Sequence, residues 1–110
     1  MGYYTRYAVK ISGADDENQT RQILEALELH REHRKDFSAD GTEVEVLTEP
    51  QKWYTWEREC IYVSRVYPKI TIDVYGEGEE SGDVWKARVR NGESEYVKAK
   101  IVFDPFVKLP

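Results

Sequence analysis

At 110 residues, the chain is long enough for one hydrophobic core but too short for two, so we expect a single domain spanning residues 1–110. Hydrophobic residues make up 40% and charged residues 34%, a balance that argues against a disordered chain. The net charge of −5 originates in residues 1–50, which hold 6 basic and 11 acidic side chains, and this argues against indiscriminate nucleic-acid binding.

Cysteine usage and hydropathy indicate a cytoplasmic protein. The single cysteine, Cys60, has no partner for an internal disulfide, and a lone thiol suits a reducing compartment. No apolar run approaches the roughly 18 residues that a membrane span needs. Residues 1–11 lack the basic start, apolar middle and cleavage site of a signal peptide. We therefore expect no membrane contact.

The first half of the chain predicts a strand, a helix and a second strand. Residues 3–12 alternate between two faces, which is typical of a half-buried strand. Asp15 and Asp16 supply an N-cap and negative charge for a helix over residues 17–36. Residues 43–48 alternate again and predict a short strand.

A second helix is expected from Pro50, which suits a first helical turn, to the residue before Pro68. Its apolar positions follow a helical period at spacings of three and four: Trp53, Trp56, Cys60, Val63 and Tyr67. We expect these side chains to pack against the sheet.

Three further strands follow, over residues 70–75, 85–90 and 96–103. Gly76 to Asp83 connects the first two, and Asn91-Gly92 predicts a tight hairpin between the last two. In the last strand, the odd positions from Val97 to Phe103 are apolar and are expected to face the core.

The resulting order is β-α-β-α-β-β-β. It predicts an α+β domain with one mixed, mostly antiparallel sheet and two helices on one face, a ferredoxin-like variant. The first β-α-β step is expected to pair its two strands in parallel.

A resemblance to known proteins lies in the second half of the chain. The string Gly76-Glu77-Gly78-Glu79-Glu80-Ser81-Gly82-Asp83-Val84-Trp85 stands between Tyr67-Pro68 and Asn91-Gly92, after a helix opened by Trp53 and Trp56. Residues 53–106 thereby resemble small uncharacterised phage and plasmid proteins with a YubB-like ferredoxin fold. The resemblance implies a ferredoxin-like domain of mobile-element origin, and it implies no catalytic residue.

Three features are candidate sites of chemistry, and each has a simpler structural explanation. The acidic, glycine-rich segment Gly76 to Asp83 does not follow a calcium-loop pattern and reads as a hairpin connection, although an acidic docking loop stays open. His30 and His33 have a spacing that could hold a metal on a helix, but they lack further ligands. Cys60 has the helical phase of a core residue. We expect no catalytic residue, no metal and no cofactor.

The uncovered sheet face gives the most informative pattern. If the helices cover one face, cations and tyrosines from the first and the last two strands point to the other, together with Asp73 and Tyr75 from residues 70–75. The candidate binding residues are Arg6, Lys10, Lys86, Arg88, Arg90, Tyr96, Lys98 and Lys100. Cations with interspersed aromatic rings are typical of sheets that bind single-stranded nucleic acid. An ordinary solvated sheet face is the alternative explanation.

From this pattern we expect a non-enzymatic binding protein that contacts an anionic partner, either nucleic acid or an acidic protein, through a basic sheet face. The alternative is a protein-interaction or inhibitor module that acts through the acidic surfaces of residues 1–50 and the Gly76–Asp83 segment.

Overall fold

The structure is a computed structural model that describes residues 2–106. It is an α+β fold with two helices and one open sheet of six strands. The elements are β1 (Thr5–Ser12), α1 (Glu17–Ala26), β2 (Arg34–Phe37), β3 (Val44–Leu47), α2 (Trp56–Val66), β4 (Thr71–Gly78), β5 (Val84–Arg90) and β6 (Glu93–Lys98).

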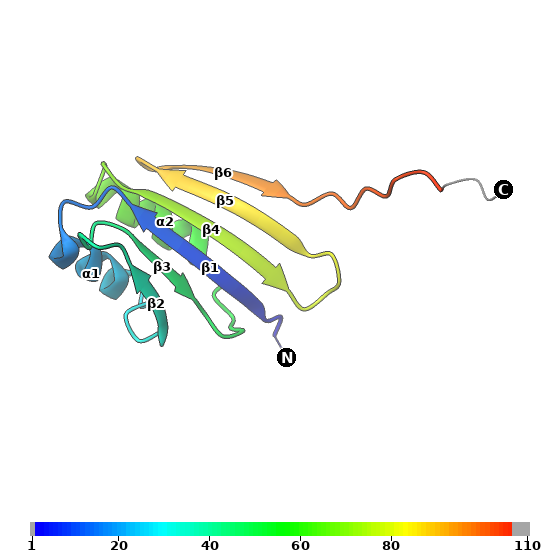
Figure 1. Ribbon diagram of the computed structural model, residues 1–110, viewed down its shortest axis with the longest axis horizontal. Helices are drawn as coiled ribbons and strands as arrows, with labels where there is room; N and C mark the ends of the chain where they lie inside the picture. Colours follow the sequence, from blue (N-terminus) through cyan, green and yellow to red (C-terminus); the bar gives the residue numbers. More distant parts are fainter. Residues whose placement is uncertain (1, 107–110) are drawn as a thin grey trace.

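The strand order is β2-β3-β1-β4-β5-β6, and every neighbouring pair is antiparallel. Both helices lie behind the sheet in Figure 1, with α1 behind the β1–β3 side and α2 behind β4 and β5. Two helices on one open sheet confirm the α+β class. Neither described helix has the length and apolar character of a membrane span. The expectation of a parallel pair between residues 3–12 and 43–48 is wrong, because β1 and β3 run antiparallel.

The reason for this difference is an additional strand. α1 ends at Ala26 and not at Asp36, and the chain then forms β2, which makes a hairpin with β3. The hairpin reverses the chain direction before β3 reaches β1. The expected sequence of elements lacked this strand.

A left-handed residue ends α1. Glu28 has φ +57°, the Leu29 N–H donates to the Leu24 carbonyl, and the Glu28 N–H donates to the Glu25 carbonyl. These two hydrogen bonds form a Schellman motif, which normally uses glycine at the left-handed position. Because this position is glutamate and not glycine, the sequence carries no glycine signal for the end of the helix.

α2 begins six residues later than expected because the preceding chain continues the sheet. Thr5 and Gln51 exchange two backbone hydrogen bonds, each 2.9 Å long. The helix starts only at Trp56, so Pro50 lies in a bend outside it.

The core lies between the helices and the inner face of the sheet. The expected inward positions of β1, β3, β4 and β5 are buried there, together with residues of both helices: Tyr7, Val9, Ile11, Val44, Val46, Ile72, Val74, Trp85, Ala87, Val89, Ile23, Leu24, Cys60 and Val63. The last strand differs from its expectation. β6 ends at Lys98, and Val97, Ile101 and Phe103 are exposed.

Candidate functional site

The front of the sheet in Figure 1 carries no helix within residues 2–106, and we call it the open face. Alternate positions of every strand point to it, because successive side chains in a strand point to opposite faces. Its charged members on the strands are six cations and six carboxylates: Arg6, Lys10, Arg34, Lys86, Arg88 and Arg90, with Asp36, Glu45, Asp73, Glu77, Glu93 and Glu95.

Charges of opposite sign alternate across the middle of this face. The strand registers align one side chain from each of five strands, in the order Glu45, Lys10, Asp73, Arg88 and Glu95. We call this set the charge row. Directly opposed side chains in antiparallel strands are close enough to interact, so each cation of the row lies between two carboxylates.

The contact between Arg88 and Asp73 is the tightest part of the charge row. The Arg88 Nε donates to Asp73 Oδ1 at 2.7 Å. The pKa of Arg88 is raised, first by this hydrogen bond and then by the charge of Asp73. The hydrogen bond holds one nitrogen of the Arg88 guanidinium against Asp73, while the Arg88 side chain stays 65% exposed.

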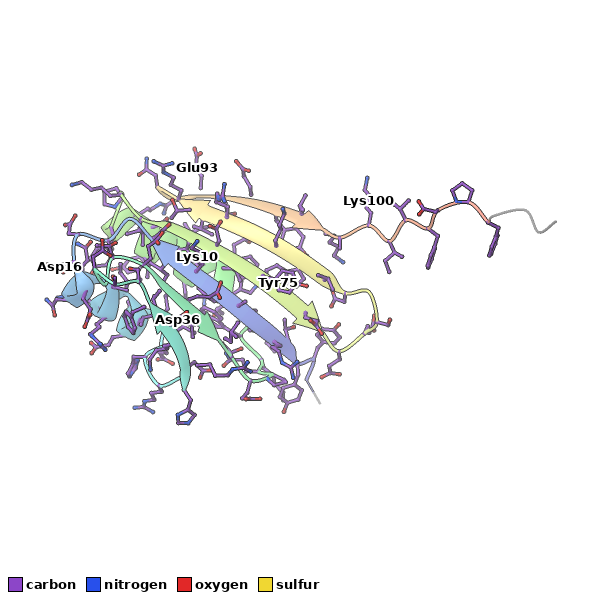
Figure 2. All side chains as sticks on the ribbon, viewed as in Figure 1. Lys10, Asp16, Asp36, Tyr75, Glu93 and Lys100 are labelled. Atoms are coloured by element: carbon purple, nitrogen blue, oxygen red, sulfur yellow. The ribbon has the colours of Figure 1, made fainter. Side chains whose placement is uncertain are left out.

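A second aligned set lies beside the charge row and is largely apolar. It runs Leu47, Ala8, Tyr75, Lys86 and Val97 across the same five strands, and we call it the tyrosine row. Tyr75 and Val97 are 45% and 54% exposed. Figure 2 shows Lys10 of the charge row and Tyr75 over the middle of the sheet.

Residues of the two rows, all except Leu47, line a hollow of about 590 Å³. Ala8, which pairs with Tyr75, contributes the smallest side chain of the two rows to this lining. The hollow is an open depression with apolar groups on one side and paired charges on the other, which is a surface suited to receive a protruding side chain.

The structure separates the expected binding residues into two groups. Arg6, Lys10, Lys86, Arg88 and Arg90 lie on the open face as expected. The three remaining residues do not lie on it: Tyr96, Lys98 and Lys100. Tyr96 pairs with Ala87 and Lys98 pairs with Trp85, both on the helix side, and Lys100 lies beyond the end of β6.

Turn geometry explains this correction. The Asn91-Gly92 turn has two residues, both with positive φ, and it pairs Arg90 with Glu93. Even positions of β5 therefore oppose odd positions of β6. The ring of Tyr96 instead tilts against Trp85, with centroids 5.5 Å apart.

The same register changes the electrostatics of the face. Glu93 and Glu95 occupy the positions where Lys98 and Lys100 were expected to join Arg88. The open face is therefore a balanced mosaic of charges and not a basic patch. The β6 carboxylates Glu93 and Glu95 are missing from the predicted face, although the turn length alone gives the register that identifies them. The alternation of residues 70–75 already places Asp73 on this face.

The two histidines do not share a helix. His30 and His33 lie in the turn between α1 and β2, and both are exposed. Within residues 2–106, no three His, Cys, Asp or Glu side chains gather as a metal site requires.

Cys60 is fully buried on α2, as the helical spacing predicts. Burial raises the pKa of its thiol to about 12, with smaller contributions from Glu59 and Glu57. The thiol is thus protonated at neutral pH and is a poor nucleophile.

The glycine-rich segment is a hairpin connection only in its second half: Gly76, Glu77 and Gly78 end β4, and residues 79–83 connect it to β5. The N-terminal residues hold this connection in place. The Tyr3 hydroxyl donates to Asp83 and accepts from the Glu80 N–H, and the Tyr4 N–H donates to Glu79 Oε1 at 2.6 Å. The pKa of Tyr3 is raised, chiefly by the hydrogen bond to Asp83. Two of the four carboxylates of the segment are therefore engaged within the chain.

Comparisons with protein-family models, curated proteins and solved structures give no match for this chain.

Proposed function

We propose that this chain is a binding protein that docks a polypeptide partner on the open face of its sheet. The observation that carries the proposal is the pairing of the tyrosine row with the charge row around one hollow. Tyrosine and arginine are enriched at protein interfaces, where an apolar contact is surrounded by polar groups. Tyr75 and Arg88 hold those positions here.

The charge distribution favours a polypeptide over a polyanion. A nucleic acid requires several cations that are free to meet phosphates. On the open face, Lys10 and Arg88 each lie between two carboxylates, and Arg88 is hydrogen-bonded to Asp73. A polypeptide with an apolar anchor and flanking charges of both signs matches this pattern, because complementary charges fix its register.

For the fold, we propose a ferredoxin-like unit with a two-strand extension. The elements β1-α1-β2-β3-α2-β4, with the strand order β2-β3-β1-β4, support this proposal, because the ferredoxin-like arrangement has the same β-α-β-β-α-β order. β5 and β6 then extend the sheet beyond β4. A mobile-element origin follows from the resemblance of residues 53–106 and belongs to the same proposal.

Substitutions that fill or neutralise the hollow test the proposed function. Immobilised protein is expected to capture a partner from host lysate with or without nuclease treatment. Ala8→Arg and Tyr75→Ser are expected to abolish this capture, whereas Tyr62→Ser, an exposed position on α2, leaves it unchanged. Thermal melts of the three variants show whether the loss reflects the surface or the fold.

Titration with a polyanion distinguishes an anionic partner from the proposed polypeptide partner. At low ionic strength we expect no salt-sensitive binding to single-stranded nucleic acid. Arg88 and Lys98 lie on opposite sides of the sheet, so Arg88→Glu and Lys98→Glu are informative separately. Binding that falls steeply with salt and is lost only in Arg88→Glu would replace the polypeptide with an anionic partner on the same face.

A further inference from the structure

The two edge strands of the sheet differ in length and in the contacts that they make. β2, at one edge, has four residues, and the guanidinium of Arg21 covers the ring of Phe37 at 4.7 Å. β6, at the other edge, has six residues and leads into residues 99–106, which run on beyond the end of the sheet (Figures 1 and 2). Within the described residues, no strand lies outside β6. An edge of this length exposes a row of backbone groups that can pair with another strand.

The overhanging segment is strongly apolar and lies in solvent. Ile101 is 66% exposed, Val102 83%, Phe103 86% and Phe106 is fully exposed. The neighbouring strand has turned away at Val84, which is the last residue to accept from this strand, through the Ala99 N–H at 2.8 Å. Exposed apolar side chains on an unpaired extended segment mark an interaction site.

Backbone alternation shows which groups are free. In an antiparallel ladder, every second residue turns its N–H and C=O toward the neighbouring strand. Ala99 faces β5, so Ser94, Tyr96 and Lys98 face outward, and Lys100, Val102 and Asp104 continue the same parity. Pro105 has the other parity, so its missing N–H leaves the outer edge intact.

We propose that β6 and residues 99–106 pair antiparallel with the same segment of a second copy of this chain. The end of β6 and the overhang form one continuous segment with the same free edge, so a two-fold axis within the overhang pairs this segment with its own copy. The proposal concerns self-association and is independent of the partner proposed for the open face.

Side-chain chemistry supports one register. Setting Ile101 against Ile101 of the second copy also sets Ala99 against Phe103. The same register sets Lys98 against Asp104 at both ends of the pairing. Opposite charges across a strand pair stabilise it, and the apolar side chains of the two overhangs come into cross-strand contact. The charge complementarity within one short segment is the reason to assign the second copy as occupant.

This register makes a mixing experiment possible. Sedimentation velocity of the full chain is expected to show a concentration-dependent monomer–dimer equilibrium. Lys98→Asp and Asp104→Lys each replace attraction by repulsion in both symmetry-related pairs, so each alone is expected to weaken dimerisation about tenfold. An equimolar mixture of the two variants restores opposite charges at both ends and is expected to form heterodimers as tightly as the wild type.

Two further variants complete the test. Ile101→Asp places like charges at the two-fold axis and is expected to leave only monomer. Tyr62→Asp, exposed on α2, is expected to dimerise normally. Unchanged thermal melts are expected for all variants, since the altered side chains lie on the surface. A wild-type chain that stays monomeric at every concentration, or a dimer indifferent to residues 98, 101 and 104, overturns the proposal.

Discussion

The indole ring of Trp56, at the start of α2, stacks on the indole ring of Trp85 in β5, with the centroids 4.7 Å apart and the planes inclined by 21°. Trp85 is almost completely buried, and Tyr7 meets it edge-on with centroids 6.1 Å apart. Trp53 packs against Tyr7 in turn, at 5.4 Å. This aromatic cluster joins the helix to the centre of the sheet.

A double-mutant cycle measures the stack directly. Urea denaturation of Trp56→Leu, Trp85→Leu and the double variant is expected to give a coupling free energy of about 0.5–1.5 kcal/mol, because stacked rings interact beyond the area they bury. Trp56→Leu combined with Phe37→Leu, in the distant strand β2, is the control and is expected to be additive. A coupling of zero for the tryptophan pair would show that the rings do not stack in solution.

Val63 tests the packing of α2 on the sheet. Its side chain is 2% exposed. Val63→Ala is expected to lower the free energy of unfolding by about 1–3 kcal/mol, since it removes buried methyl groups and leaves a cavity. Tyr62→Ala, one residue earlier and largely exposed, is expected to change it by less than about 0.5 kcal/mol. Equal effects of the two substitutions in chemical denaturation would contradict the orientation of the helix.

Glu28 is expected to be a site where glycine stabilises the protein. Its φ of +57° is unfavourable for a side chain with a Cβ. Glu28→Gly is therefore expected to raise the free energy of unfolding by about 0.5–1 kcal/mol. Glu25→Gly, inside α1, is expected to lower it by about 1 kcal/mol. Shifts of the same sign in both melting temperatures would argue against the left-handed helix end.

Cys60 predicts a loss of stability in alkaline solution. Its folded pKa is raised to about 12, so the folded protein keeps a proton that the unfolded chain releases above its ordinary value near 9. The contribution is fully present below that ordinary pKa and is lost as pH rises from about 9 toward 12. Thiol titration of the native protein at pH 8 is expected to show no reaction, whereas the urea-unfolded chain reacts fully. Cys60→Ser tests the slope, because it should flatten the pH dependence of unfolding in this window.

Where a strand is buried on one face, the alternation of apolar and polar residues is sufficient to predict which side chains face the core. It predicts the inward positions of β1, β4 and β5, where Val9, Ile72 and Val89 are completely buried. β2 gives no such signal, because Arg34-Lys35-Asp36-Phe37 lies at the sheet edge and is held by pairing with β3. The apolar residues after Ala26 continue a helical spacing, and only the local conformation of Glu28 shows that the helix has ended.

The residues of the open face could not all be predicted, for a different reason. The cations of β1 and β5 can be assigned to one face from alternation alone. Assigning Lys98 to a face also requires the register of the hairpin, which a two-residue turn determines. Asp73 follows from the alternation of its own strand, whereas Glu95 can be assigned to the face only when the β5–β6 register is known.

The position of β1 has a consequence for how the chain folds. The strand comes first in the sequence but lies in the middle of the sheet, where Ile11 pairs with both Val44 and Ile72. β4, β5 and β6 are joined by short connections and form from local contacts, which are fast. During synthesis, β3 emerges about 33 residues after β1, but the second partner of β1, β4, emerges only roughly sixty residues after it. Closure of the loop between β1 and β4 is therefore expected to limit the refolding rate, and substitutions in β1 should slow folding, because its contacts form in that step.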